Sequence, residues 1–165
     1  MKTLVITIRE LEEKDIPSCV EMTITSFPWT AYGLTAGQAT KFFLERLSKQ
    51  LVFVAENEGE VVGFIALKKN VLFANYIRRL VVSEKHRSLG IGSKLLTFVE
   101  ELTLKEDHLP NVFLLTSTQN LRAITFYLRN NYQIIGKIKD FVDTGLDEYI
   151  LWKSFGTING LGKYH

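Results

Sequence analysis

Residues 51–82 contain three consecutive stretches rich in β-branched and aromatic residues, and this arrangement restricts the fold more than any other feature of the chain. Residues 51–67, LVFVAENEGEVVGFIAL, have the pattern of a β-hairpin, with two strands around a Glu-Asn-Glu-Gly-Glu turn. Residues 71–82 continue as a third strand rich in aliphatic side chains. Short connections join antiparallel neighbours, so the sequence predicts an antiparallel meander in the middle of the chain.

The segments on either side of this meander alternate between the period of a helix and that of a strand. A Thr35–Gln38 capping box marks the start of the second helix, and Asn120 is a plausible N-cap for the last one. The expected strands outside the meander are residues 4–9, 112–117, 132–142 and 147–155, and the expected helices are residues 12–26, 35–50, 121–130 and a segment that begins at about residue 90. The predicted order of elements is therefore βααβββαβαββ.

Length and composition favour one domain, because 165 residues with 46% hydrophobic content can bury one substantial core. We expect that domain to span residues 1–155 and the glycine-rich, polar residues 156–165 to form a flexible tail. The formal net charge is only +2 and no long run of like charge occurs, so the sequence does not favour a nucleic-acid partner.

Neither a signal peptide nor a membrane span is indicated, because residues 1–10 contain only a short apolar run with acidic residues close behind. We therefore expect a cytoplasmic protein with no membrane partner. The single cysteine, Cys19, cannot form an intramolecular disulfide and lies in a helical pattern. We interpret it as a small buried hydrophobic residue and not as a nucleophile.

Two glycines, Gly90 and Gly92, stand in the sequence HRSLGIGSKLL at the expected start of a helix. Glycine weakens helices, so two of them here require a reason. The first amides of a helix, when no side chain covers them, bind phosphate oxygens, and close helix packing is the alternative explanation. A Walker loop does not fit, because residues 92–94 read Gly-Ser-Lys, and a dinucleotide-binding fingerprint does not fit, because Leu95 stands where its third glycine belongs.

Residues 87–92, Arg-Ser-Leu-Gly-Ile-Gly, resemble the acetyl-CoA motif Gln/Arg-x-x-Gly-x-Gly/Ala of the GNAT family of N-acetyltransferases. A second motif of that family, N-x-x-A-x-x-F-Y-x-K-x-G-F, matches Asn120, Ala123, Phe126, Tyr127, Arg129, Asn131 and Tyr132, with Asn131 where glycine is usual. Asparagine tolerates the left-handed conformation, so that departure is mild. With the order of elements and the terminal strand DEYILWK, the resemblance extends from about residue 4 to residue 153.

The resemblance implies a fold and a reaction. The implied fold is α/β (α+β), with a central mixed, mostly antiparallel seven-stranded sheet flanked by four helices. The implied reaction moves the acetyl group of acetyl-CoA to a primary amine by direct attack in a ternary complex, because no plausible cysteine nucleophile accompanies the motif. Several family members use a glutamate as general base at the position where this chain has Tyr76. Because that glutamate is absent, a catalytically silent protein that only binds acyl-CoA remains an alternative.

The resemblance also implies the residues that bind acetyl-CoA. The backbone of Leu80, Val81 and Val82 would hold the pantetheine arm, and the N–H of Leu80 would face the thioester carbonyl. The pyrophosphate would be bound by the amides of Ser88, Leu89, Gly90, Ile91, Gly92 and Ser93, with charge from Arg87 and Lys94. Asn120, Ala123 and Tyr127 would complete the contacts, although Asn120 fits equally well as a helix cap that needs no ligand.

Tyr127 is the implied proton donor to the departing thiolate, because a phenol can give its proton to a thiolate held in contact with it. The alternative interpretation is that Tyr127 is only a half-buried aromatic residue of the helix. Several family members carry glutamate as general base eleven residues before the Gln/Arg of the phosphate motif, where this chain has Tyr76. We expect Tyr76 to orient the amine or a water, with Arg78 beside it on the same strand face and able to lower its pKa, and Glu148 or Tyr149 as fallback bases. No metal is expected, because no cluster has metal-ligand spacing.

The segment TSFPWTAYG, residues 25–33, resembles the substrate loop of the ribosomal-protein alanine N-acetyltransferases. That resemblance implies a peptide N-terminus as acceptor, with Phe27, Trp29 and Tyr32 packing on its first side chains, and Arg78 and Glu148 as further acceptor contacts. Anchoring of the loop is the alternative interpretation of Trp29. Small amines such as polyamines stay open as acceptors, and both a monomer and a homodimer remain possible.

Overall fold

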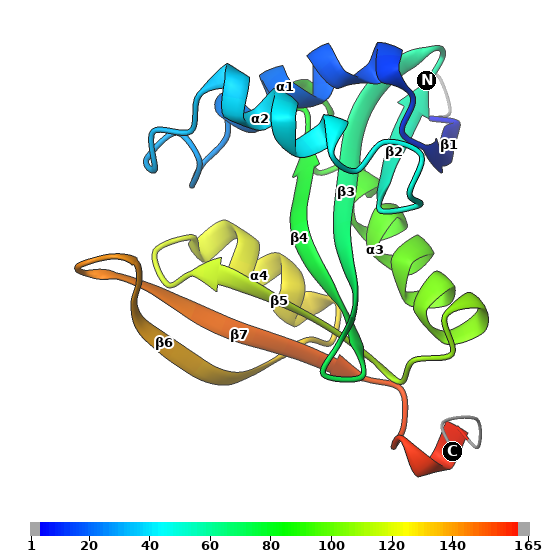
Figure 1. Cartoon of the computed structure of the whole chain (residues 1–165), viewed down its shortest axis with the longest axis vertical. Coiled ribbons are helices and arrows are strands. Elements are labelled where there is room, and N and C mark those ends of the chain that lie inside the picture. Colours follow the sequence, from blue (N-terminus) through cyan, green and yellow to red (C-terminus); the bar gives the residue numbers. More distant parts are fainter. Residues whose placement is uncertain (1–3, 162–165) are drawn as a thin grey trace. The chain divides into compact units, whose positions relative to one another are not determined.

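The computed structural model describes residues 4–161, and in them the elements follow the expected order βααβββαβαββ (Figure 1). The strands are β1 (Ile6–Glu10), β2 (Val52–Asn57), β3 (Glu60–Val71), β4 (Ala74–Val82), β5 (Asn111–Ser117), β6 (Gln133–Asp143) and β7 (Leu146–Ser154). The α-helices are α1 (Ile16–Ile24), α2 (Ala36–Leu44), α3 (Ile91–Glu101) and α4 (Leu121–Arg129). The sheet has the strand order β1-β2-β3-β4-β5-β7-β6. Strands β4 and β5 are parallel, whereas β1–β2, β2–β3, β5–β7 and β6–β7 pair antiparallel, which confirms the expected mixed seven-stranded sheet with four helices.

The described chain forms two compact units. Residues 4–67 and 79–98 make up the first unit, which holds α1, α2, β1, β2 and most of α3. Residues 68–78 and 99–161 make up the second, which holds β5, α4, β6 and β7. Strands β3 and β4 contribute residues to both units. In residues 4–161 no helix is long and apolar enough to cross a membrane.

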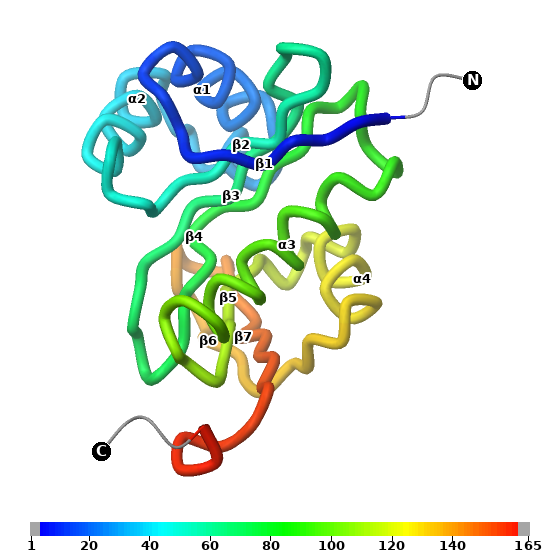
Figure 2. Tube along the Cα trace, turned by 90° about the vertical axis from the view of Figure 1, so that its right-hand side faces the viewer, coloured from blue at the N-terminus to red at the C-terminus, as the bar shows by residue number. Residues whose placement is uncertain are grey.

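In the first unit β2 buries both of its faces over residues 52–55. Neighbouring residues of a strand point to opposite sides, so Val52 and Val54 of β2 share one face and Phe53 lies on the other. Val52 and Val54 belong to the core cluster that contains residues of α1 and α2, whereas the ring of Phe53 contacts Phe98 of α3 at 4.9 Å. Helices α1 and α2 therefore cover one face of these strands and α3 covers the other, as Figure 2 shows.

An ion-pair cluster joins β1, β2 and the start of α1 in the first unit. The Arg9 guanidinium makes two hydrogen bonds to the buried Asp15 carboxylate, at 2.7 and 3.0 Å, and a third to Glu56 at 2.7 Å. The backbone N–H of Glu12 also donates to Asp15, at 2.8 Å. Burial raises the pKa of Asp15, but these hydrogen bonds and the charge of Arg9 outweigh that effect and lower it below its usual value.

In the second unit β6 and β7 form a long hairpin (Figure 1), and α4 lies on one side of β5 and β7 (Figure 2). A buried polar cluster joins the end of α3 to these strands. Lys153 donates to both carboxylate oxygens of Glu100, at 2.9 and 3.0 Å, and the Tyr132 hydroxyl donates to Glu100 at 3.2 Å. The buried charges are thus paired and hydrogen-bonded, as burial of a charge requires.

Several boundaries differ from the sequence prediction. Helix α2 ends at Leu44 and not near residue 50, because the chain turns over residues 45–50, where Ser48 and Gln50 have positive φ. Strand β4 begins at Ala74 and not at residue 71, because Leu72 and Phe73 form the turn with positive φ. In the expected tail, residues 159–161 form a short 3-10 helix, and residues 162–165 lie outside the described part of the chain.

Two local predictions are confirmed. Cys19 is fully buried in α1, and burial raises the pKa of its thiol to about 12, which agrees with a small hydrophobic residue and not a nucleophile. Thr35 and Gln38 form the capping box of α2, with each side chain accepting a hydrogen bond from the backbone N–H of the other, at 3.2 and 3.0 Å.

Candidate active site

The connection from β4 to α3 lies in the first unit. It carries the residues that the sequence predicts to bind phosphate. A short 3-10 helix, η2 (Glu84–His86), follows β4, and the Ser83 hydroxyl and His86 Nδ1 share a hydrogen bond of 2.6 Å. The Arg87 side chain folds back toward β4, with Nε donating to the Val82 carbonyl at 3.4 Å. These contacts fix the start of the connection against the end of β4.

The backbone between Arg87 and α3 has the shape of an anion site. Ser88 and Gly90 have φ values of +64° and +83°, on either side of Leu89, and such alternation turns successive N–H groups to one side. The backbone N–H of Lys94 donates to the Gly90 carbonyl at 3.1 Å, so the N–H groups of residues 91–93 precede the first helical hydrogen bond. The helix dipole adds positive potential at these amides. Backbone N–H groups arranged in this way can bind an anion such as phosphate.

Gly90 is needed here for its conformation and not for tight packing. A Cβ at this position would have no atom within 4 Å, yet its φ of +83° is one that other residues rarely adopt. The sequence argument for a bare backbone thus gains a second physical reason. Gly63 of β3 differs, because a Cβ there would lie 3.0 Å from the Val81 carbonyl and 3.3 Å from Leu95.

Strand β4 brings Leu80, Val81 and Val82 to the start of this connection, and these residues also belong to the first unit. The Val81 side chain is part of the core cluster beneath α1 and α2. Leu80 is half-buried, and alternation directs its side chain to the opposite face. The Ser83 N–H donates to the Val62 carbonyl of β3 at 2.8 Å, which holds the end of β4 in the sheet.

Tyr127 lies in α4 of the second unit, and its ring is buried with 6% of its surface exposed. The ring meets Phe126 and Tyr132 edge-on, with centroids 5.0 and 5.6 Å away, so its orientation is fixed by packing. Burial raises the pKa of the Tyr127 hydroxyl above its usual value, which keeps it protonated at neutral pH.

Both ends of α4 agree with the sequence prediction. The Asn120 side chain accepts a hydrogen bond from the Ala123 N–H at 3.2 Å, so Asn120 is the N-cap of the helix. Asn131 has a φ of +70°, the left-handed conformation expected where the family motif has glycine. The cap uses the carbonyl oxygen of the Asn120 side chain, and its NH₂ group keeps two donors for other acceptors.

Tyr76 belongs to a stack of three rings across β4, β5 and β7 in the second unit. Its ring lies nearly parallel to Phe113 at 4.8 Å, and Phe113 stacks on Trp152 at 5.5 Å. The sequence did not indicate that Phe113 and Trp152 lie beside Tyr76. The strand register that pairs residue 76 with 113, and 113 with 152, joins segments far apart in the chain. Their β-branched and aromatic neighbours predicted the strands but not the register.

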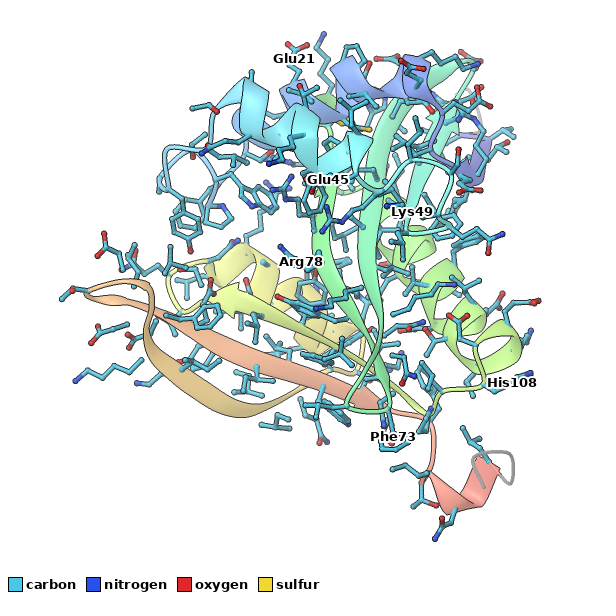
Figure 3. All side chains as sticks on the ribbon, viewed as in Figure 1. Glu21, Glu45, Lys49, Phe73, Arg78 and His108 are labelled. Atoms are coloured by element: carbon cyan, nitrogen blue, oxygen red, sulfur yellow. The ribbon has the colours of Figure 1, made fainter. Side chains whose placement is uncertain are left out.

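The charges of Arg78 and Glu148 both affect the pKa of Tyr76. The effect of Arg78 is the one that the sequence predicts. The Arg78 guanidinium lies 5.9 Å from the Tyr76 ring, and Figure 3 marks Arg78 on β4. Burial raises the pKa of Tyr76, the positive charge of Arg78 opposes this rise, and the negative charge of Glu148 adds to it. The expected lowering by Arg78 is therefore present but outweighed, so the Tyr76 hydroxyl stays protonated at neutral pH.

The segment of residues 25–35 between α1 and α2 is a compact loop in the first unit, and we call it the acceptor loop after the role that the sequence predicts for it. Its N–H groups bond within it: Thr30 donates to Ser26 at 3.0 Å, and Tyr32 and Leu34 both donate to the Trp29 carbonyl at 3.2 Å. Trp29 is half-buried and packs against the core cluster, whereas Phe27 is 45% exposed. The loop thus holds Trp29 inward and presents Phe27 outward.

The described residues include two histidines, His86 and His108. His86 is half-buried beside Ser83, and His108 is exposed after the end of the helix that follows α3 (Figure 3). Among residues 4–161 no group of three histidine, cysteine or acidic side chains is arranged to hold a metal ion.

The chain is similar to known proteins in sequence and in fold. The family model described as the acetyltransferase (GNAT) family matches residues 10–132. A protein named N-alpha-acetyltransferase from Sulfolobus acidocaldarius is 28% identical, over 67% of this chain and 73% of that protein. The crystal structure of Ard1 from Thermoplasma volcanium has a TM-score of 0.79 and 28% identity, and covers 92% of this chain and 99% of that one. The ribosomal-protein-S18-alanine N-acetyltransferase from Escherichia coli shares the fold, with a TM-score of 0.73 at 19% identity over 93% of this chain and 96% of that one.

Proposed function

Because the chain belongs to the acetyltransferase (GNAT) family, it is an acetyl-CoA-dependent N-acetyltransferase, and we propose that its acceptor is the α-amine at the N-terminus of a polypeptide. One observation carries this proposal: the relative that is 28% identical over two thirds of the chain is named N-alpha-acetyltransferase. The exposed Phe27 of the acceptor loop supports it, because an aromatic ring suits contact with the first side chains of a peptide. The proposed place of action is the cytoplasm.

In this proposal the first unit binds the cofactor. The amides of residues 88–93 bind the pyrophosphate of CoA, since the positive φ values of Ser88 and Gly90 and the open start of α3 present N–H groups to an anion. Arg87 and Lys94 add positive charge. The backbone of residues 80–82 holds the pantetheine arm as an added strand, and the Leu80 N–H donates to the thioester oxygen as negative charge develops there.

The chemical step is a direct transfer. The nitrogen of the amine forms a bond to the acetyl carbon, the bond from that carbon to sulfur breaks, and the amine loses one proton. Tyr127 gives its hydroxyl proton to the departing thiolate and regains one from solvent. Burial raises the pKa of Tyr127, so its hydroxyl holds its proton until the thiolate forms beside it.

Tyr76 orients the incoming amine or a water that takes its proton, because burial leaves the Tyr76 hydroxyl protonated and able to donate or accept a hydrogen bond. Glu148 is the second candidate for the base. It is 7% exposed and lies close enough to Tyr76 to raise its pKa, so a proton released near Tyr76 has a carboxylate within electrostatic reach.

An acceptor comparison tests the proposal. Purified chain and acetyl-CoA are mixed with three amines: a lysine-free peptide with a free α-amine, the same peptide with a blocked α-amine and one added lysine, and spermidine. Thiol release gives the rate, and mass spectrometry locates the acetyl group. We expect turnover with the free α-amine alone. Turnover confined to spermidine or to the lysine side chain would contradict the proposed acceptor, and CoA binding without turnover on any amine would indicate a silent module.

A further inference from the structure

Arg79 contacts two aromatic side chains that come from different parts of the first unit. Its guanidinium carbon lies 3.6 Å from the centroid of the Phe42 ring in α2 and 5.8 Å from that of the Trp29 ring in the acceptor loop. Arg79 is half-buried, and a cation over an aromatic face gains most where water is partly excluded. One side chain of β4 therefore touches both α2 and the acceptor loop.

A second arginine fixes Phe42 from its other side. The guanidinium carbon of Arg46 lies 3.7 Å from the same centroid, and Arg46 also donates to the Phe42 carbonyl at 2.9 Å. Two guanidinium groups this close to one centroid would overlap on a single face, so they lie on opposite faces of the ring. Phe42 is thus held between two cations.

Trp29 is the residue through which Arg79 reaches the backbone of the acceptor loop. The N–H groups of Tyr32 and Leu34 both donate to the Trp29 carbonyl, so the position of Trp29 determines the turn over residues 29–34. Phe27 lies two residues before Trp29 and is the exposed aromatic side chain of the loop. A contact that holds Trp29 therefore also sets where the loop presents Phe27.

Arg79 also adjoins the amide that we assign to the thioester oxygen. The N–H of Leu80 belongs to the peptide bond between residues 79 and 80, so the same residue shares a rigid peptide plane with that donor. We propose that Arg79 is a positioning residue that holds the acceptor loop, through Trp29, in the conformation that receives the amine. The loop's part in acceptor binding rests on the proposed function.

The guanidinium suits this role better than an ammonium would. Its planar, weakly hydrated group stacks on aromatic faces, whereas an ammonium is a compact and strongly hydrated charge. Arg79→Lys therefore keeps the charge and loses much of the stacking, and Arg79→Met keeps an aliphatic stem and loses both. Arg46→Met is the matched control, because Arg46 stacks on the same Phe42 ring as Arg79 does.

Hydrogen exchange tests whether Arg79 holds the loop, with no need for an acceptor. The amides of Thr30, Tyr32 and Leu34 are hydrogen-bonded within the loop, and amides of β2 serve as the reference for global unfolding. We expect Arg79→Met to speed exchange of the loop amides about tenfold and Arg79→Lys to give an intermediate change, with β2 unchanged. Unchanged loop exchange in Arg79→Met, or an equal rise in Arg46→Met, would overturn the proposal.

Kinetics tests whether the held conformation serves the acceptor. With the free α-amine peptide, Arg79→Met should raise the acceptor KM about fivefold while the Kd for acetyl-CoA stays within about twofold, and Arg79→Lys should restore part of the loss. Faster loop exchange with an unchanged acceptor KM would overturn the positioning role. If no amine is turned over, the proposed function fails, and the exchange comparison still decides whether Arg79 holds the loop.

Discussion

Gly90 and Gly59 form a matched pair for testing the phosphate-binding backbone. Both have a φ of +83°, and neither has an atom within 4 Å of the place where a Cβ would stand. Gly59 lies in the turn between β2 and β3, and Gly90 lies at the start of α3. A substitution at either position therefore meets the same backbone strain, and only the one at Gly90 places a side chain where the phosphate is expected.

The strain sets the expected loss of stability. An alanine in the left-handed region costs about 1–2 kcal/mol, and for a chain of this size each kcal/mol lowers Tm by about 2–4 °C. Gly59→Ala and Gly90→Ala should therefore lower Tm by similar amounts, about 2–8 °C. Asparagine tolerates this conformation better, so both asparagine variants should be more stable than the alanine variants.

The affinity for CoA should follow the opposite order at Gly90. Hydrogen bonds from amides to a charged group contribute about 1.5–3 kcal/mol each, so a side chain that displaces one should weaken binding roughly 10- to 100-fold. The larger asparagine should weaken it more than alanine, although it strains the backbone less. Calorimetric titration with CoA measures this. Both Gly59 variants should bind like the wild type, and a folded Gly90→Asn protein with wild-type affinity would refute the phosphate assignment.

Three further outcomes follow from packing and charge. Gly63→Ala should lower the free energy of unfolding by about 1–3 kcal/mol, because its Cβ would stand 3.0 Å from the Val81 carbonyl, and an unchanged urea midpoint would contradict this. Arg9→Met should cost about 3 kcal/mol at pH 7, because it leaves the buried Asp15 carboxylate without its main partner. The pKa of Asp15 is lowered below 3.8 in the folded protein, so this stabilisation is complete above about pH 4 and is lost as the pH falls. The difference in unfolding free energy between wild type and variant should therefore shrink toward pH 2. A constant difference would argue against the ion pair. Cys19, with a pKa of about 12, should react with a thiol reagent only as fast as the chain unfolds, and labelling within seconds in the folded protein would contradict its burial.

The parts of the fold that depend on local signals could be predicted from the sequence. The capping box at Thr35, the cap at Asn120 and the left-handed Asn131 each involve residues within a few positions of one another, and the structure has all three. The end of α2 and the turn at Leu72 and Phe73 could not be predicted. Ser48 and Gln50 after α2, like Leu72 and Phe73, adopt positive φ against their own preference, which only the surrounding structure can impose.

The candidate site divides in the same way. The residues of the loop before α3 follow one another in the chain, so their motif predicted them together. The stack of Tyr76, Phe113 and Trp152 depends on the register of three strands, and the contact of Arg79 with Trp29 joins residues fifty positions apart. Neither leaves a local pattern in the sequence. The balance of burial and charge at Tyr76 likewise depends on which side chains the fold brings near it.

The single-turnover rate of Tyr127→Phe tests the catalytic account most directly. Phenylalanine removes only the hydroxyl, which acts on a charge that appears when the thioester breaks, while the edge contacts of the ring with Phe126 and Tyr132 can persist. Rapid-quench measurement at saturating acetyl-CoA, with enzyme in excess over the free α-amine peptide, separates this step from product release. The account predicts a rate about 10²-fold below wild type and a Kd for acetyl-CoA within a few-fold of wild type. A wild-type single-turnover rate together with lost stability or lost cofactor affinity would show that Tyr127 is a packing residue and that the thiolate takes its proton elsewhere.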